Sequence, residues 1–285
     1  MTRNSAALVF LLLARAAGAA DTAAQSHGPA YGLSTPTLGR GGWSLDVGVM
    51  DRVVGDKQMA MTRPMLSYGI TEDLQVSVSL PMPLYVPQGL PHGRSTARMP
   101  TNPDIEILVG WRFHRRGTDI GSRFESTTYF GFDYPTDPIR AGARTYPGLY
   151  AAAVTGYASR TVYAWVGGLY RRYMSPVGPT ADHLGDLAMY SLVVGYRPPP
   201  FQRDFPNPDW RVFIEAVGEY SARDAIAGVE QANTGGHQIF VGPTLLGLYG
   251  SWGISGGPVF PVYRRLNGSQ PGDKVRVIVN TTFWF

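Results

Sequence analysis

The sequence predicts an all-β fold, a transmembrane antiparallel up-and-down β-barrel of twelve strands. Three observations predict it. Apolar and polar residues alternate in segment after segment, short and long connections follow one another, and the chain ends on an aromatic residue inside its last strand. Period-two alternation is typical of a strand with two different faces. The 35 glycines, 23 prolines and 12% aromatic residues also favour strands and turns over helices.

The first 19 residues have the pattern of a secretory signal peptide. Arg3 precedes an apolar run from Ala6 to Ala14, and small residues follow at 17–19. The run is about 13 Å long as a helix, well short of the roughly 20 residues that a membrane helix needs. We therefore expect residues 1–19 to direct export and to be removed. A mitochondrial presequence and a fortuitous apolar start are the alternatives.

Strand alternation is clearest between residues 74 and 86. The even-numbered residues from Leu74 to Val86 are all apolar, whereas Gln75, Ser77 and Ser79 are polar. Each expected strand is close to the roughly 9 to 11 residues that a tilted membrane strand needs. Eleven further segments have similar character: 43–52, 59–68, 104–114, 123–134, 149–158, 161–173, 187–197, 210–220, 238–248, 252–263 and 275–285.

The connections between these strands are of two kinds. Compact turns follow the second, fourth, sixth and tenth strands, and longer loops rich in Gly, Pro and Asp follow the third, fifth, seventh, ninth and eleventh. Short turns at one rim and long loops at the other are typical of outer-membrane barrels, and an even strand number returns both termini to the periplasmic side. Two connections depart from this scheme, because 198–209 is too long and 53–57 too short. A miscounted strand pair therefore stays open.

Charged residues decide which face of the barrel meets lipid, because a soluble barrel would turn the same apolar face inward. Charges occupy mid-strand positions on the polar faces, and a charge facing lipid at the midplane costs roughly 2–4 kcal/mol. Aromatic residues also gather toward strand ends, as at Trp43, Trp111 and Trp252, which is typical of interfacial girdles. The residues expected to line the lumen are Asp46, Arg52, Arg63, Gln75, Asp104, Glu106, Arg112, Arg123, Glu125, Asp133, Arg211, Glu215, Glu219 and Arg276.

Acidic and basic residues of this expected lumen nearly balance, so they form either a bracing ladder of salt bridges or a transverse field that orients solutes. Twelve strands lie between the roughly eight of a filled barrel and the 16–18 of an open porin, which predicts a narrow passage. Residues 20–42 lack strand alternation. We expect them to be a periplasmic N-terminal segment that partly fills the lumen or hangs free, and residues 43–285 to form the barrel.

The motifs that could carry chemistry are weak. Residues 253–257 match G-x-S-x-G but lie inside an expected strand with no helix after them. Asp182, His183 and Asp186 are the best metal-like group, and an exposed loop explains them equally well. We expect no enzyme activity, metal or cofactor; a lipid-degrading barrel using His114 or Ser255, or a closed structural or binding barrel, is the alternative. The chain has no cysteine, and a net charge of +4 with scattered arginines does not indicate a nucleic-acid partner.

The C-terminal strand has a distinctive end. Phe283 and Phe285 share a face with Val277 and Val279. This resembles the C-terminal signature of bacterial outer-membrane barrels, an aromatic last residue heading alternate apolar ones. The resemblance implies that Phe283 and Phe285 form a membrane-insertion signal for the barrel-assembly machinery, and that outer-membrane lipid surrounds the barrel.

Four short stretches, at 27–37 (HGPAYGLSTPT), 41–44 (GGWS), 66–76 (LSYGITEDLQV) and 102–106 (NPDIE), carry a family resemblance. They resemble the outer-membrane transporters labelled "MetA-pathway of phenol degradation", which are distantly similar to fatty-acid and aromatic-hydrocarbon channels. The resemblance covers the mature chain, residues 21–285. It implies a porin-like transporter in the Gram-negative outer membrane for small, including aromatic, organic solutes, and it assigns no site residues.

Overall fold

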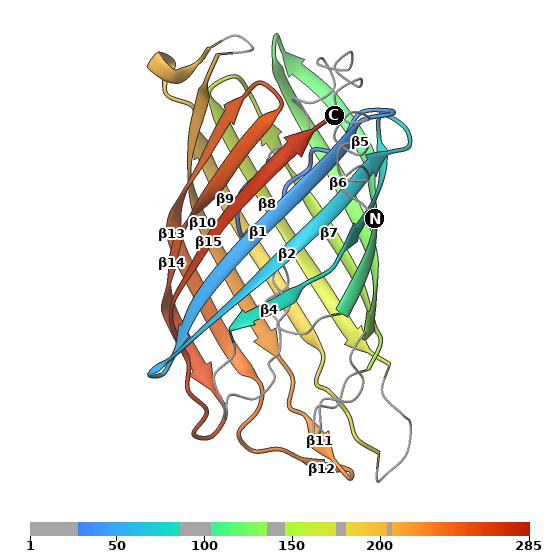
Figure 1. Ribbon diagram of the computed structural model, residues 1–285, viewed down its shortest axis with the longest axis vertical. Coiled ribbons are helices and arrows are strands. Elements are labelled where there is room, and N and C mark those ends of the chain that lie inside the picture. The colour runs from blue at the N-terminus through green and yellow to red at the C-terminus, as the bar shows by residue number, and fades with distance from the viewer. Residues whose placement is uncertain (1–27, 86–103, 136–145, 175–180, 204–206) are drawn as a thin grey trace, which may run out of the picture.

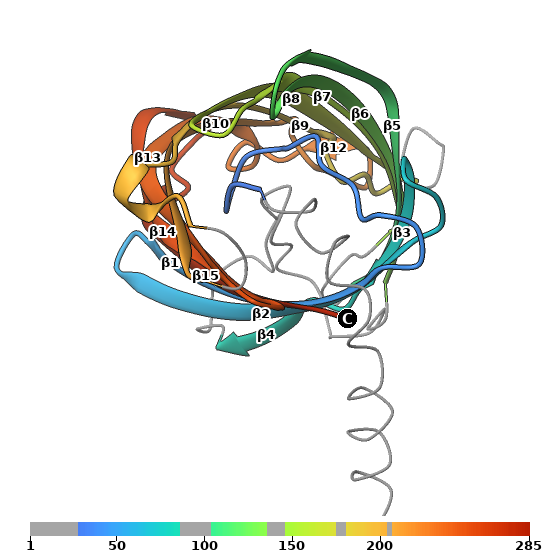
Figure 2. The same cartoon turned by 90° about the horizontal axis from the view of Figure 1, so that it is seen from above.

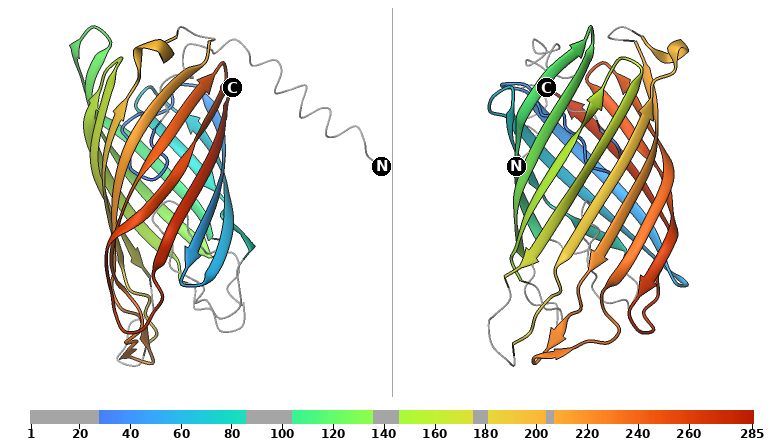
Figure 3. Two further views of the ribbon diagram at one scale, coloured as in Figure 1. Left: turned by 90° about the vertical axis from the view of Figure 1, so that its left-hand side faces the viewer. Right: turned by 180° about the vertical axis from the view of Figure 1, so that it is seen from behind.

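The protein folds into one closed antiparallel sheet, so the predicted twelve-stranded barrel is confirmed. The computed structural model describes residues 28–85, 104–135, 146–174, 181–203 and 207–285. Tilted strands surround a single axis (Figures 1 and 3). The strands are β1 (Trp43–Val54), β2 (Lys57–Gly69), β3 (Leu74–Ser79), β4 (Met82–Tyr85), β5 (Asp104–Asp119), β6 (Ser122–Pro135), β7 (Gly148–Ala158), β8 (Val162–Tyr173), β9 (Leu187–Tyr196), β10 (Asp209–Ser221), β11 (Ala225–Ile226), β12 (Val229–Glu230), β13 (Gly236–Tyr249), β14 (Trp252–Leu266) and β15 (Asp273–Trp284).

The ring closes at β1, which pairs with β2 on one side and with β15 on the other. β3 and β4 both pair with β2 and together form one strand of the barrel. The break between them falls at Leu80 and Pro81, where proline has no N–H for the ladder. Thirteen segments of the main sheet therefore correspond to twelve strands.

Neither irregular connection changes the strand count. The short one is a hairpin in which Val54 pairs with Lys57, and Gly55 has the positive φ of +60° that such a turn requires. The long one contains a 3-10 turn, Pro199–Phe201, at the rim where the C-terminus lies (Figure 1). The short turn lies at the rim where a long loop was expected, and the long connection lies at the rim where a short turn was expected. The pairing of the strands is the same in either case.

The expected compact turn at 115–122 is wrong in its bounds. β5 continues to Asp119 and β6 starts at Ser122, so only two residues form the turn and the hairpin extends beyond the rim (Figure 1). Residues 115–119 are mostly polar and exposed on both faces. Period-two alternation requires one buried face, and this part of the hairpin has none.

The outer surface of the barrel carries an apolar belt. On β1, Leu45, Val47 and Val49 are each about 40% exposed, whereas Ser44 and Met50 on the opposite face are buried. The same pattern recurs around the barrel. Exposed outward-facing examples are Val78, Ile107, Phe130, Leu149, Val166, Leu192, Ile214, Leu245, Ile254 and Val279.

The interior is less polar than the expected charge-lined lumen. Met50 and Met61 are paired across β1 and β2, and both are buried together with Val193, Phe240 and Val259. These side chains belong to one apolar cluster within the barrel. The inner face is therefore a layer of apolar packing between groups of charged residues. In the part of the chain described, no helix is long and apolar enough to cross a membrane.

Candidate functional site: the barrel lumen

Residues 28–39 lie inside the barrel along the inner face of its strands, and we call them the luminal segment (Figure 2). Thr35 and Thr37 are completely buried, and Leu38 is nearly so. The segment leads to β1 at the rim, where Gly41 N donates to Gly69 O and Gly69 N donates to Gly42 O. The sequence left open whether residues 20–42 fill the lumen or hang free, and residues 28–39 lie inside.

Glu215 on β10 holds the start of the luminal segment. Its carboxylate accepts hydrogen bonds from the backbone N–H groups of Ala30 (2.8 Å), Tyr31 (2.8 Å) and Gly32 (2.6 Å). Thr244 Oγ1 donates to the same carboxylate at 2.5 Å. Glu215 is completely buried, and a buried charge needs such donors to offset its lost hydration. The structure therefore fixes the segment by charge-assisted hydrogen bonds.

Thr35 anchors the middle of the segment to two strands, β6 and β8. Its hydroxyl donates to Glu125 Oε2 (3.2 Å) and accepts from Trp165 Nε1 (3.1 Å). Its carbonyl oxygen accepts from Thr127 Oγ1 at 2.6 Å. Because all these groups are buried, each bond satisfies an atom that water does not reach.

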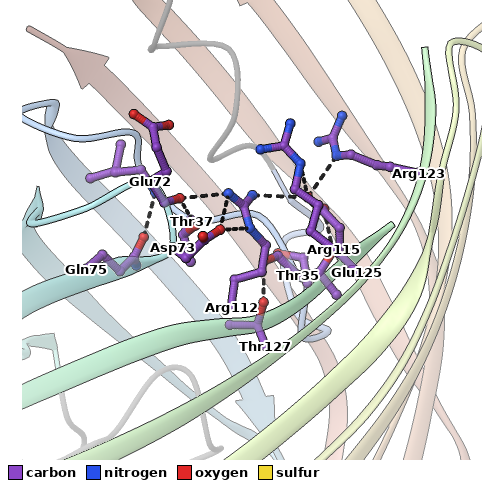
Figure 4. A network of polar contacts seen from close by, with 12 residues as sticks. Thr35, Thr37, Glu72, Asp73, Gln75, Arg112, Arg115, Arg123, Glu125 and Thr127 are labelled. Atoms are coloured by element: carbon purple, nitrogen blue, oxygen red, sulfur yellow. Dashed lines mark hydrogen bonds and ion pairs between the residues drawn. The ribbon is translucent and has the colours of Figure 1, made fainter. Parts of the chain in front are cut away.

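Arg112 connects this anchor to the rim, as Figure 4 shows. Its guanidinium donates to Asp73 Oδ1 (2.8 Å), Glu125 Oε1 (3.0 Å) and Glu72 O (2.7 Å). Arg123 Nε also lies 2.9 Å from Glu125 Oε1. Two buried side chains, Arg112 and Glu125, thus join the β2–β3 turn to the luminal segment.

A second charged group centres on Glu106. Its carboxylate contacts Arg63 at 2.5 Å and Arg171 at 3.0 Å, and Arg171 Nε lies 3.1 Å from Asp133 Oδ2. The Arg171 guanidinium also stacks 4.9 Å above the centre of the Tyr150 ring. Two acids and two arginines are therefore joined in one buried network.

A third group centres on Arg276, whose two terminal nitrogens each lie 2.9 Å from an oxygen of Glu219. Arg276 also contacts Asp273 at 2.5 Å, and Arg52 contacts Asp273 at 2.9 Å. Residues three apart in a regular strand face opposite ways. The register shift in the β1–β15 pairing beside Val54 places Asp273 and Arg276 on the same side.

A cavity of about 210 Å³ lies between the luminal segment and the barrel wall. Below it, a layer that includes Tyr31, Met189, Phe240 and Val259 surrounds a space of only about 10 Å³. The cavity wall includes Ser44, Asp46, Arg63, Gln75, Leu108, Tyr129, Tyr150, Leu246, Ser255, Asn280 and Trp284.

The residues expected to line the lumen fall into these groups. Asp104 begins β5, and its side chain lies outside the described residues. Arg211 pairs with Asp209 at 2.9 Å and lies over the Tyr163 ring. Arg112, Arg123 and Glu125 meet at the rim. Arg63, Glu106 and Asp133 belong to the group centred on Glu106, and Arg52, Glu219 and Arg276 belong to the group centred on Arg276. Asp46 and Gln75 line the cavity, and Glu215 holds the luminal segment.

Sequence reasoning missed Arg171, Asp73, Asp209 and Asp273. Arg171 is followed by Arg172, and two adjacent arginines do not reveal which one faces inward. Asp73 lies in a turn, and Asp209 and Asp273 lie just before the expected strands. Alternation alone offers no signal for such positions.

The candidate groups for lipid chemistry do not come together. Ser255 lines the cavity from within β14, and no helix follows its glycine-rich motif. His114 is exposed and packs against the exposed ring of Phe124, 6.2 Å away. In the loops, Asp182 accepts a hydrogen bond from Ala227 N, and no group of three potential metal ligands occurs among the described residues.

Comparison with known proteins relates the chain to outer-membrane channels by fold. No family model matches the chain, and no curated protein matches it. An outer membrane channel from Pseudomonas putida F1 aligns with a TM-score of 0.61 and 11% identity, over 92% of this chain and all of the channel. The NanC porin aligns with a TM-score of 0.50 and 10% identity, over 84% of this chain and 98% of the porin. The chain is thus similar in fold to solved outer-membrane channels.

Proposed function

We propose that this protein is an outer-membrane channel or transporter for small organic solutes, exported by residues 1–19 and closed at rest by its luminal segment. The observation that carries the proposal is a closed barrel with an apolar belt outside and a cavity of about 210 Å³ inside. An apolar belt of this kind suits lipid. The solved channel and porin that share the fold support the same function.

The size and lining of the cavity favour a small solute with an apolar body. An engineered apolar cavity of ~150 Å³ already binds benzene, so the present cavity has room for one aromatic ring with a polar substituent. The resemblance to transporters labelled "MetA-pathway of phenol degradation" supports aromatic solutes within this proposal. Phe283 and Phe285 are proposed to present the last strand to the barrel-assembly machinery.

The test is conductance in planar lipid bilayers, with the mature chain compared with a variant that lacks residues 21–38. We expect a small or mostly closed conductance for the mature chain and a larger, more persistent one for the variant. Heat-modifiable gel migration first establishes that both barrels are folded. If both are folded, yet neither conducts nor passes solutes into liposomes, the protein is a closed barrel and the proposal is wrong.

A further inference from the structure

Asp46 differs from most carboxylates inside the barrel. Among the carboxylates that the described strands turn into the lumen, Asp46 and Glu215 have no salt bridge to arginine. Glu215 is completely buried, and its oxygens are occupied by the luminal segment and Thr244. Asp46 instead forms part of the cavity wall.

Neutral groups hold the Asp46 carboxylate in place. Ser44 Oγ donates to Oδ2 at 3.2 Å, and Asn280 Nδ2 donates to Oδ1 at 3.4 Å. The Thr282 hydroxyl donates to Oδ1 as well. A carboxylate has about four acceptor positions, so acceptor capacity is left on the side of the cavity. The three neutral donors orient the charge without cancelling it.

The remaining charge on the wall acts on Asp46 without forming an ion pair with it. Arg63 is the other charged residue that lines the cavity, and its guanidinium lies 2.5 Å from Glu106. Arg63 pairs across the sheet with Gly48, which is two residues from Asp46 along β1. Leu108 and Tyr129 supply apolar surface to the same cavity. The cavity thus combines one carboxylate without an ion pair and apolar surface large enough for a ring.

We infer that the cavity binds small organic cations, with the ammonium group of the solute on Asp46 and its apolar body against Leu108 and Tyr129. This inference rests on the proposed function and names the class of solute. A hydrogen bond between an ammonium and a carboxylate is roughly twice as strong as one between neutral groups, and it gains further where water is scarce. A carboxylate-bearing solute would meet the charge of Asp46 and bind more weakly.

The test uses three probes that share a ring and differ in charge: benzylamine, benzyl alcohol and benzoate. Their binding to the folded mature protein in detergent is measured by isothermal titration at constant ionic strength. We expect benzylamine to bind at least about tenfold more tightly than benzyl alcohol, and benzoate to bind most weakly. Equal affinities, or tightest binding of benzoate, would overturn the inference.

Asp46→Asn keeps the shape of the side chain and removes its charge, so it should lower the affinity for benzylamine to that for benzyl alcohol. Asp56→Asn is the matched control, because Asp56 is exposed in the β1–β2 turn and its loss should leave the series unchanged. An unchanged series in folded Asp46→Asn contradicts the inference. Should that variant not fold, the wild-type series alone decides.

The binding assay needs no transport, so the two proposals fail separately. A barrel that conducts but does not prefer benzylamine refutes the cation site and leaves the channel. A barrel that prefers benzylamine but neither conducts nor passes solutes supports the site and refutes the channel.

Discussion

Replacing Glu215 by glutamine should release the start of the luminal segment. The wild-type carboxylate accepts four hydrogen bonds, two at each oxygen. Glutamine keeps one acceptor oxygen and puts an NH₂ group where the other was, so at least one N–H group of the segment loses its partner, and the bonds that remain lose the charge of their acceptor. At about 1 kcal/mol for the lost bond and about 1 kcal/mol for the lost charge, the bound state weakens by about 2 kcal/mol, or roughly 30-fold in the equilibrium between bound and released segment.

Because the chain has no cysteine, a single introduced thiol can report how often the luminal segment is released. Ala30→Cys introduces a single thiol beside Glu215 at a position that is only 6% exposed. The rate of its reaction with a water-soluble maleimide measures how often the segment leaves the wall. In the Glu215→Gln background we expect this rate to rise by at least about tenfold. Ile226→Cys, exposed in the β11–β12 hairpin, should react equally fast in both backgrounds.

One result would refute the reasoning about Glu215. If Ala30→Cys reacts at the same rate whether or not the Glu215→Gln substitution is present, while both barrels are folded, the carboxylate does not hold the segment. The anchor would then be Thr35 and its partners on β6 and β8.

Two further predictions concern stability and assembly. Arg171→Met should lower the free energy of unfolding by roughly 3–5 kcal/mol, because Glu106 and Asp133 lose a buried partner. Arg172→Met, on the outer face, should change the free energy of unfolding little. Urea unfolding followed by gel migration measures both variants. A chain without Phe285 should give a lower yield of folded barrel in the outer membrane. The reason is that the two backbone hydrogen bonds between Phe285 and Trp43 are lost where β15 and β1 close the ring. An undiminished yield would contradict the prediction.

Much of the fold follows from alternation, because each strand has an outer face that must be apolar. Leu45, Val47 and Val49 illustrate this, and the twelve expected segments correspond to the strands observed. The interior was harder to predict. Met50 and Phe240 face inward, but their outward-facing neighbours Val49 and Ile239 are apolar as well. Alternation therefore does not distinguish the inner face from the outer face at these positions.

The position of the luminal segment could not be predicted from its residues. It has no regular structure of its own, and its hydrogen bonds reach distant residues such as Glu125, 90 positions from Thr35, and Glu215, 185 positions from Ala30. Such contacts depend on which strands surround the lumen. The Arg276 group was equally hidden, because only the register shift near Val54 brings Asp273 to the inner face.

The luminal segment is also a ligand that is covalently tethered to its own binding site. It continues through Gly41 and Gly42 into β1, and a short tether of this kind gives an effective concentration on the order of millimolar. Gly28, Ser34 and Pro36 form part of the cavity wall. A solute that occupies their positions must therefore displace the segment, and it competes with the segment at this effective concentration. The competition is independent of how much protein the cell makes. The protein therefore sets its own affinity threshold for solute entry.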